Sequence, residues 1–333
     1  MKYCAPLIIY ALAFAGAALS AAESPYHVVA HYKINGAADF DGLCLDADAR
    51  RLYVAHGARI EVLNADSGEN VGAISSLQSA HDVAVVSELK HGFVSDGATD
   101  SITMFDTDTL KVLKVIKSTG RNPAAIAYDA TARKVFVANR DSGTLTVLDP
   151  ASGEVISTVT VGGKLRQMVC NGYGWIFVAA EDQDAIHIVD TRSLKPLGDF
   201  PVAPGRAPDG LAIEPVTKRL FVGCGNGKLV VIDSDIGFAF TVLPIGSGAS
   251  GVVCDRSAQE ALPRDTKWKG RVLTVTADGV LSVVRMVSPV KWAFNGKTPA
   301  LPGAHSIVFD PKTNRAFIPA VNSGALELLV VGY

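Results

Sequence analysis

Short apolar segments recur along the chain at a nearly constant interval, and each carries an aromatic or large aliphatic residue at its second position. The seven copies are Leu52-Tyr53-Val54-Ala55, Gly92-Phe93-Val94-Ser95, Val135-Phe136-Val137-Ala138, Ile176-Phe177-Val178-Ala179, Leu220-Phe221-Val222-Gly223, Val272-Leu273-Thr274-Val275 and Ala316-Phe317-Ile318-Pro319. Their second residues are separated by 40, 43, 41, 44, 52 and 44 positions. A repeat of about 40–50 residues is typical of one blade of a β-propeller.

Each repeat contains three further segments with the character of β-strands. In the third repeat, the apolar residues 125–128 precede an acidic turn and the recurring segment. A turn rich in Gly, Asn and Asp then leads to the alternating residues 144–148, and a second turn leads to residues 155–161. Val, Ile and Thr dominate these runs, and they show no helical period. The sequence therefore predicts an all-β fold, a seven-bladed β-propeller of four-stranded blades.

The last repeat is one strand short. Only residues 326–331 follow its recurring segment, whereas residues 26–34, ahead of the first repeat, have the pattern of an outer strand. We therefore expect the N-terminal strand to close the last blade and to cover its free sheet edge.

The third repeat also carries a family resemblance. Val137-Ala138-Asn139, followed by Asp149-Pro150 and Val159-Thr160-Val161-Gly162, resembles the YVTN-repeat, lactonase-like seven-bladed propellers of the exported bacterial type. The resemblance runs over the mature chain and implies the propeller fold, and propeller lactonases hydrolyse lactones or esters. The Asn position of the motif is occupied by His56, Asp96, Asn139, Ala180, Cys224, Thr276 and Ala320 in the seven copies.

The first 22 residues have the pattern of a secretory signal peptide. Lys2 precedes an apolar run from Ala5 to Leu19, and small residues occupy positions 21 and 22. The run is shorter than the roughly 20 residues that span a membrane, and we expect no span later in the sequence. We therefore expect residues 1–22 to be cleaved and residues 23–333 to form a single propeller domain, soluble in the periplasm or secreted.

Composition gives little direct information on function. The 31 Lys and Arg nearly balance the 33 Asp and Glu, unlike the basic excess of dedicated nucleic-acid binders, so nucleic acid is not an expected partner. The cysteines of the mature chain lack the CxxC spacing of metal knuckles. We expect Cys44, Cys170 and Cys254 to be buried on separate blades and unbridged, the alternative in an oxidising compartment being one or two disulfides.

One side of the predicted funnel gathers possible metal ligands. The loops entering the inner strands meet on one face of a propeller, and alignment of these strands places equivalent residues at Asp41, His81, Ala124, Arg166, Asp209, Ser250 and His305. Asp41, His81 and His305 fall on adjacent blades, and the turns after the first two recurring segments add His56 and Asp96. Imidazole and carboxylate suit Zn, Fe, Cu or Mn and also acid–base chemistry. The alternative is that these polar residues line a wet channel and satisfy one another.

The other side of the funnel is basic. Arg121, Arg166 and Arg206 lie on loops that open with glycine, and Arg140 lies on a neighbouring turn. With the aligned Asp209, they form the predicted ligand-binding set. A guanidinium group pairs with carboxylate or phosphate through two hydrogen bonds. These residues predict a site for a small anionic ligand or for an acidic segment of a partner protein. Ordinary solvated loop charges are the alternative.

The 52-residue step arises from a long insertion at residues 255–270, which we expect on the opposite face. It carries Arg256, Arg264, Lys267, Trp268 and Lys269. An exposed Trp among cations predicts a protein contact, although a Trp packed against its own blade is the alternative.

Two functions are consistent with these patterns. A binding or scaffold protein would use the funnel for a small anionic ligand or a partner protein. An enzyme would use the His and Asp cluster for metal-assisted, lactonase-like hydrolysis. The sequence contains no Gly-x-Ser-x-Gly elbow, P-loop or dinucleotide fingerprint, so we favour binding.

Overall fold

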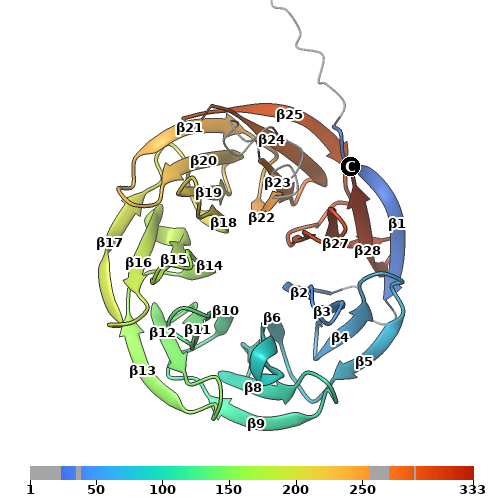
Figure 1. Cartoon of the computed structure of the whole chain (residues 1–333), viewed down its shortest axis with the longest axis vertical. Coiled ribbons are helices and arrows are strands. Elements are labelled where there is room, and N and C mark those ends of the chain that lie inside the picture. The colour runs from blue at the N-terminus through green and yellow to red at the C-terminus, as the bar shows by residue number, and fades with distance from the viewer. Residues whose placement is uncertain (1–23, 35–38, 256–269, 289) are drawn as a thin grey trace, which may run out of the picture.

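Seven four-stranded antiparallel sheets form a ring around a central axis (Figure 1). The computed structural model describes residues 24–34, 39–255, 270–288 and 290–333. The predicted all-β, seven-bladed propeller is confirmed. Within the described ranges, no helix is long and apolar enough to cross a membrane.

The strands occupy four positions in each blade, from the axis outward. The inner strands are β2 (Leu43–Asp46), β6 (Ala80–Val86), β10 (Pro123–Asp129), β14 (Leu165–Cys170), β18 (Pro208–Glu214), β22 (Ala249–Asp255) and β26 (Val308–Asp310). The recurring segments form the second strands β3 (Arg51–His56), β7 (His91–Asp96), β11 (Lys134–Asn139), β15 (Trp175–Ala180), β19 (Arg219–Cys224), β23 (Arg271–Thr276) and β27 (Arg315–Asn322).

The remaining strands complete each blade toward the rim. The third strands are β4 (Arg59–Asn64), β8 (Ser101–Asp106), β12 (Thr144–Leu148), β16 (Ala185–Asp190), β20 (Lys228–Asp233), β24 (Val280–Ser288) and β28 (Ala325–Gly332). The outer strands are β5 (Asn70–Ile74), β9 (Val112–Lys117), β13 (Val155–Thr160), β17 (Lys195–Pro201), β21 (Ala239–Pro244), β25 (Lys291–Pro299) and β1 (His27–Ile34). Two short 3₁₀ turns are η1 (Ser87–Leu89) and η2 (Glu181–Gln183).

The core lies between the faces of neighbouring blades. The aromatic residues of the recurring segments are fully buried, and they are Tyr53, Phe93, Phe136, Phe177, Phe221 and Phe317. Tyr53 of the first blade, for example, packs in one cluster with Val83 and Phe105 of the second. Each blade buries both of its faces against the neighbouring blades. The middle strands therefore appear in the sequence as runs of mostly apolar residues.

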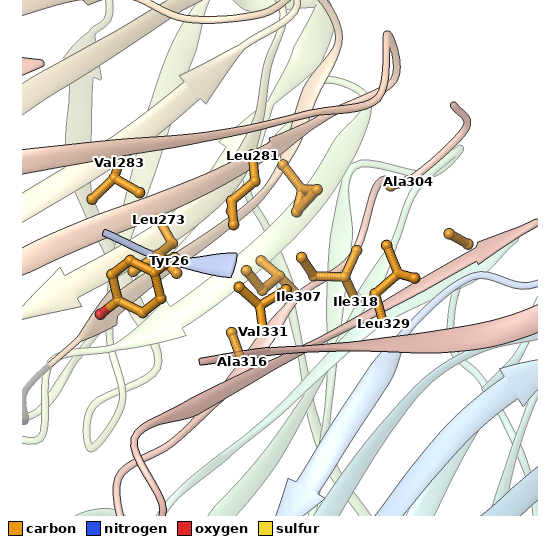
Figure 2. Packing of buried hydrophobic residues seen from close by; sticks show 12 residues of the cluster. Tyr26, Leu273, Leu281, Val283, Ala304, Ile307, Ala316, Ile318, Leu329 and Val331 are labelled. Atoms are coloured by element: carbon orange, nitrogen blue, oxygen red, sulfur yellow. The ribbon is translucent and has the colours of Figure 1, made fainter. Parts of the chain in front are cut away.

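The N-terminal strand closes the ring, as predicted. β1 pairs antiparallel with β28, which gives the last blade the order β1-β28-β27-β26. The preceding residue, Tyr26, is fully buried in a cluster formed by the sixth and seventh blades, where it lies beside Leu273, Ile307 and Val331 (Figure 2). The two ends of the propeller chain are therefore joined within a single blade.

Five inner strands share an irregularity at the same end. The pairing of β6, β10, β14, β18 and β22 with their second strands shifts register near the start of each inner strand. Such bulges bend a strand and turn successive residues away from regular alternation. The residues that the alignment placed around the funnel lie at these bulges in those five blades.

Candidate functional site

A polar cavity lies at the mouth of the central channel, at the bulged ends of the inner strands. Its volume is about 330 Å³. The residues selected from the sequence that line it are Asp41, His81, Arg140, Arg166, Asp209 and His305. Asn122, Gln167, Ser250 and Ser306 contribute further polar groups, and Phe40 adds an aromatic ring. The structure thus brings together side chains from all seven blades, while their roles in function stay predictions.

Four other selected residues lie outside this cavity lining. His56 and Asp96 are buried at the ends of β3 and β7, and the carboxylate of Asp96 accepts the backbone N–H groups of Gln78 (2.7 Å) and Ser79 (3.1 Å). Arg121 and Arg206 are exposed on the entry loops of the third and fifth blades. The alignment did not distinguish residues of the cavity wall from residues of the loops around it.

Asp41 and His81 form a close pair at one side of the cavity. Nδ1 of His81 lies 2.5 Å from Oδ2 of Asp41. Gly42 permits this approach, since its N–H donates to the His81 carbonyl oxygen (2.6 Å) and an added Cβ would lie 2.5 Å from that oxygen. The hydrogen bond to the Asp41 carboxylate raises the pKa of His81. The pair therefore favours a charged imidazole that is held in one orientation.

His305 lies near the same carboxylate. Its Nε2 is 3.9 Å from Oδ1 of Asp41, and its Nδ1 donates to the carbonyl oxygen of Gly303 at 2.8 Å. The imidazole stacks on Phe40 with a centroid separation of 4.4 Å and an interplanar angle of 9°. The imidazole of His305 is thus fixed with its Nε2 facing Asp41.

The five proposed metal ligands do not form one cluster. Among the residues that the structure describes, no three His, Cys, Asp or Glu side chains converge closely enough to hold a metal ion. Asp41, His81 and His305 line the cavity, whereas His56 and Asp96 lie in the blade interiors. The assignment of Zn, Fe, Cu or Mn to this set stays a prediction.

The basic side of the cavity is built around a shared carboxylate. Oε2 of Glu181, in η2, lies 2.8 Å from Nε of Arg166 and 3.2 Å from Nη2 of Arg140. Nε of Arg166 also lies 3.8 Å from Oδ1 of Asp209. Burial raises the pKa of Asp209, although the charge of Arg166 opposes this shift. Two guanidinium groups therefore face Glu181, and Arg166 also faces a carboxyl whose ionisation burial disfavours.

Asp82 is the most informative residue that the sequence analysis missed. It follows His81 in the β6 bulge and lines both the polar cavity and the channel beneath it. Its Oδ2 accepts the N–H of Ile126 from the next blade (3.1 Å), and its Oδ1 accepts the N–H of Val83 (2.9 Å). Burial raises the pKa of Asp82 to about 7, and the charge of Asp41 acts in the same direction. This carboxyl therefore changes charge near neutral pH, which is a common property of residues in functional sites.

The channel beneath the cavity is lined by three cysteines. Cys44, Cys170 and Cys254 lie on separate blades, and no disulfide joins them, as predicted. They are only partly buried, contrary to our expectation, because the channel reaches them, whereas Cys224 is fully buried. Burial in the channel wall raises the pKa of the Cys44 and Cys170 thiols, which keeps these two thiols protonated and slow to react at neutral pH.

The predicted partner-binding insertion falls outside the described residues, apart from its ends at Asp255 and Gly270. Its cations and Trp268 therefore carry no structural argument here.

These features define a seven-bladed propeller with a charged central cavity. A sequence model of the family described as "Lactonase, 7-bladed beta-propeller" matches residues 45–168. This match confirms the resemblance to lactonase-like seven-bladed propellers that the repeats indicated. No curated protein matches the sequence significantly.

Solved structures with the same fold are numerous. The WD40 repeats of RRP9 superpose with a TM-score of 0.75 at 11% identity, covering 93% of this chain and 99% of that one. U3-55K gives 0.74 at 11% identity, with 92% and 99% covered. A chain of a mitotic checkpoint complex gives 0.77 at 15% identity, with 100% and 97% covered. At such identities the likeness shows the fold alone, and function has to be argued from the site.

Proposed function

We propose that this protein is an exported binding protein whose central cavity holds a small anionic ligand. The observation that carries the proposal is the arrangement of Arg140 and Arg166 around the single carboxylate of Glu181, on the wall of a cavity of about 330 Å³. The family match alone would suggest hydrolysis, but it covers only residues 45–168, and no three His, Cys, Asp or Glu side chains of the described residues converge to hold a metal ion.

The chemistry of the basic wall suits a carboxylate ligand. The contacts described above use one nitrogen of each guanidinium, so each group has further N–H donors to offer an incoming oxyanion. Glu181 holds the two arginines side by side before the ligand arrives, which lowers the entropy cost of binding. Ser250, Asn122 and Gln167 also line the cavity and can provide hydrogen bonds for the polar remainder of a ligand.

The proposal extends to location and partners. The signal-peptide pattern of residues 1–22 supports cleavage and export to the periplasm or the outside, with residues 23–333 as the mature domain. Protein partners are also compatible with the fold, since one of the similar propellers is part of a mitotic checkpoint complex. A partner would present an acidic segment to the same arginines.

Substitution of the arginines tests the binding proposal. We expect Arg140→Gln and Arg166→Gln each to weaken binding of butyrate, a minimal carboxylate probe, by about 10- to 100-fold, because each change removes charge-assisted hydrogen bonds. Affinity should also fall as salt is raised. Isothermal titration calorimetry gives both quantities. Arg192→Gln, an exposed arginine on the β16–β17 turn, is the matched control and should bind like the wild type.

Equal affinity for butyrate in the wild type and in the three arginine variants would contradict the proposal.

One observation favours a second candidate, metal-assisted hydrolysis of a lactone or ester. Asp41 orients His81 toward a fixed position, as a carboxylate does for a metal ligand or a general base. Elemental analysis of protein purified without a metal-affinity tag separates the candidates. Stoichiometric Zn, Fe, Cu or Mn that disappears in the His81→Ala/His305→Ala double variant would favour the hydrolase. The binding proposal instead predicts a metal content that does not depend on these two residues.

A further inference from the structure

The cavity wall beside the two arginines also carries a carboxyl group. Asp209, in the bulge of β18, lines the cavity together with Arg140 and Arg166. Its only ion pair among the described residues is with Nε of Arg166 at 3.8 Å, which is longer than a hydrogen bond. A purely anionic ligand between the arginines would therefore lie next to a carboxylate that no close cation balances.

The first blade contains the same local structure. Residues 41–43 and 209–211 both have the sequence Asp-Gly-Leu, and in both the leucine pairs with the third residue of its blade's recurring segment. Each glycine allows the next blade to approach closely. A Cβ added to the first glycine would lie 2.5 Å from the carbonyl oxygen of His81, and one added to the second would lie 2.3 Å from that of Ser250. The two aspartates are therefore equivalent positions in the ring.

The two aspartates differ in what the next blade offers them. Nδ1 of His81 lies 2.5 Å from Oδ2 of Asp41, so the first carboxylate has its cation within the protein. At the fifth blade, Ser250 takes the place of His81, and its neutral hydroxyl donates a hydrogen bond to Asp209. The side chain of Asp209 is only 20% exposed. Because largely buried carboxylates are ordinarily paired with a cation, a ligand that carries one gains by binding here.

We propose that the ligand is a small α-amino acid in its zwitterionic form, with its carboxylate between Arg140 and Arg166 and its ammonium group at Asp209 and Ser250. The spacing supports an α-amino acid. Nε of Arg166 and Oδ1 of Asp209 are 3.8 Å apart, so the two charges of the ligand must also be close neighbours, as they are on one carbon atom. This inference rests on the proposed function, because the arginines must hold the carboxylate. It adds the ligand class and an ammonium subsite.

Two probes that differ only in an α-ammonium group test the inference. Butyrate and L-2-aminobutyrate can be compared by isothermal titration calorimetry at pH 7, where the ammonium group is charged. The ammonium group adds charge-assisted hydrogen bonds to Asp209 and Ser250. We therefore expect the dissociation constant of L-2-aminobutyrate to be lower than that of butyrate by about 10- to 100-fold.

Asp209→Asn should affect the two probes differently. The substitution should weaken L-2-aminobutyrate at least about ten-fold, because it removes the partner of the ammonium group. It should not weaken butyrate, since it removes a negative charge beside the butyrate carboxylate. A residue that only supports the fold would weaken both probes. Asp108→Asn, which changes an exposed aspartate on the β8–β9 turn, is the matched control and should bind both probes like the wild type.

The outcomes separate this inference from the proposed function. Equal affinities for the two probes in the wild type, with loss of both in Arg166→Gln, would overturn the inference and leave the anion site intact. An advantage of L-2-aminobutyrate that persists in Asp209→Asn, or an equal weakening of both probes in that variant, would also overturn it. Binding of L-2-aminobutyrate with the same affinity in the wild type and Arg166→Gln would overturn both, since its carboxylate would then lie elsewhere. Failure of both probes to bind would also overturn both.

Discussion

A chain that lacks residues 26–34 is expected to lose the stable ring. This segment connects three blades. Tyr26 donates its hydroxyl to Asp255 of the sixth blade, and Oγ1 of Thr298 donates to the Tyr26 carbonyl oxygen at 2.5 Å. β1 itself supplies the outer strand of the seventh blade, and the hydroxyl of Tyr32 donates to the Asp66 carbonyl oxygen of the first blade at 2.8 Å. Deletion would expose the edge of β28 and the apolar cluster around Tyr26, so we expect aggregation at ordinary temperatures.

A single substitution measures the same effect without the risk of aggregation. Tyr26→Ala should lower the free energy of unfolding by about 3–5 kcal/mol, because a fully buried aromatic ring leaves a cavity. For a protein of this size the melting temperature should fall by roughly 5–8 °C in differential scanning calorimetry. Tyr173→Ala, which removes a tyrosine that is 66% exposed, is the matched control and should melt within a degree or two of the wild type. Unchanged melting of Tyr26→Ala would mean that the N-terminal segment does not close the ring.

Replacement of Asp82 by Asn is expected to change how the stability of the protein depends on pH. The pKa of Asp82 in the folded state is about 7, well above its usual value of 3.8. The folded protein therefore holds this proton more tightly than the unfolded chain does. The resulting stability is fully present below about pH 4 and is lost as the pH rises toward 7. Asp82→Asn removes this loss. The free energy of unfolding of the variant, relative to that of the wild type, should therefore rise by up to about 4 kcal/mol between pH 4 and pH 8.

Denaturant unfolding at a series of pH values measures that difference. Asp48→Asn is the control, because Asp48 is exposed and its hydrogen bond to Lys312 lowers its pKa, which gives a pH dependence of the opposite direction. The ionisation of Asp82 should also affect the affinity for butyrate. Ionisation of Asp82 places a negative charge at the cavity, so butyrate affinity should fall between pH 6 and pH 8 in the wild type and stay more constant in Asp82→Asn. A stability difference that does not change with pH would show that Asp82 ionises at its ordinary pKa.

The sequence predicted the ring more completely than the site. The seven recurring segments became the second strands because each needs an aromatic or large aliphatic residue between two blades, as Tyr53 and Phe177 show. The missing strand of the last blade likewise pointed to β1, because a free edge needs a partner.

The site was harder to predict because bulges and loop geometry control it. The alignment took one residue from each inner strand, whereas the β6 bulge brings both His81 and Asp82 to the cavity. Glu181 follows a second strand, and only the turn of η2 carries it to Arg140 and Arg166. Asp96 was selected as a ligand, but loop amides occupy its carboxylate. The residue types in a sequence do not show which carboxylates will accept hydrogen bonds from the backbone N–H groups of a loop.

Hydrogen exchange with and without saturating butyrate tests the location of the binding site most directly. If the ligand binds between Arg140 and Arg166, protection should be confined to the bulged ends of the inner strands, near residues 81–83, 124–126, 166–168 and 209–211. A competing location is a groove of about 360 Å³ on the opposite face, between Trp175 and Lys218. Protection of residues 171–175 and 215–218 instead, with none at the inner-strand ends, would contradict the assignment of the central cavity as the functional site.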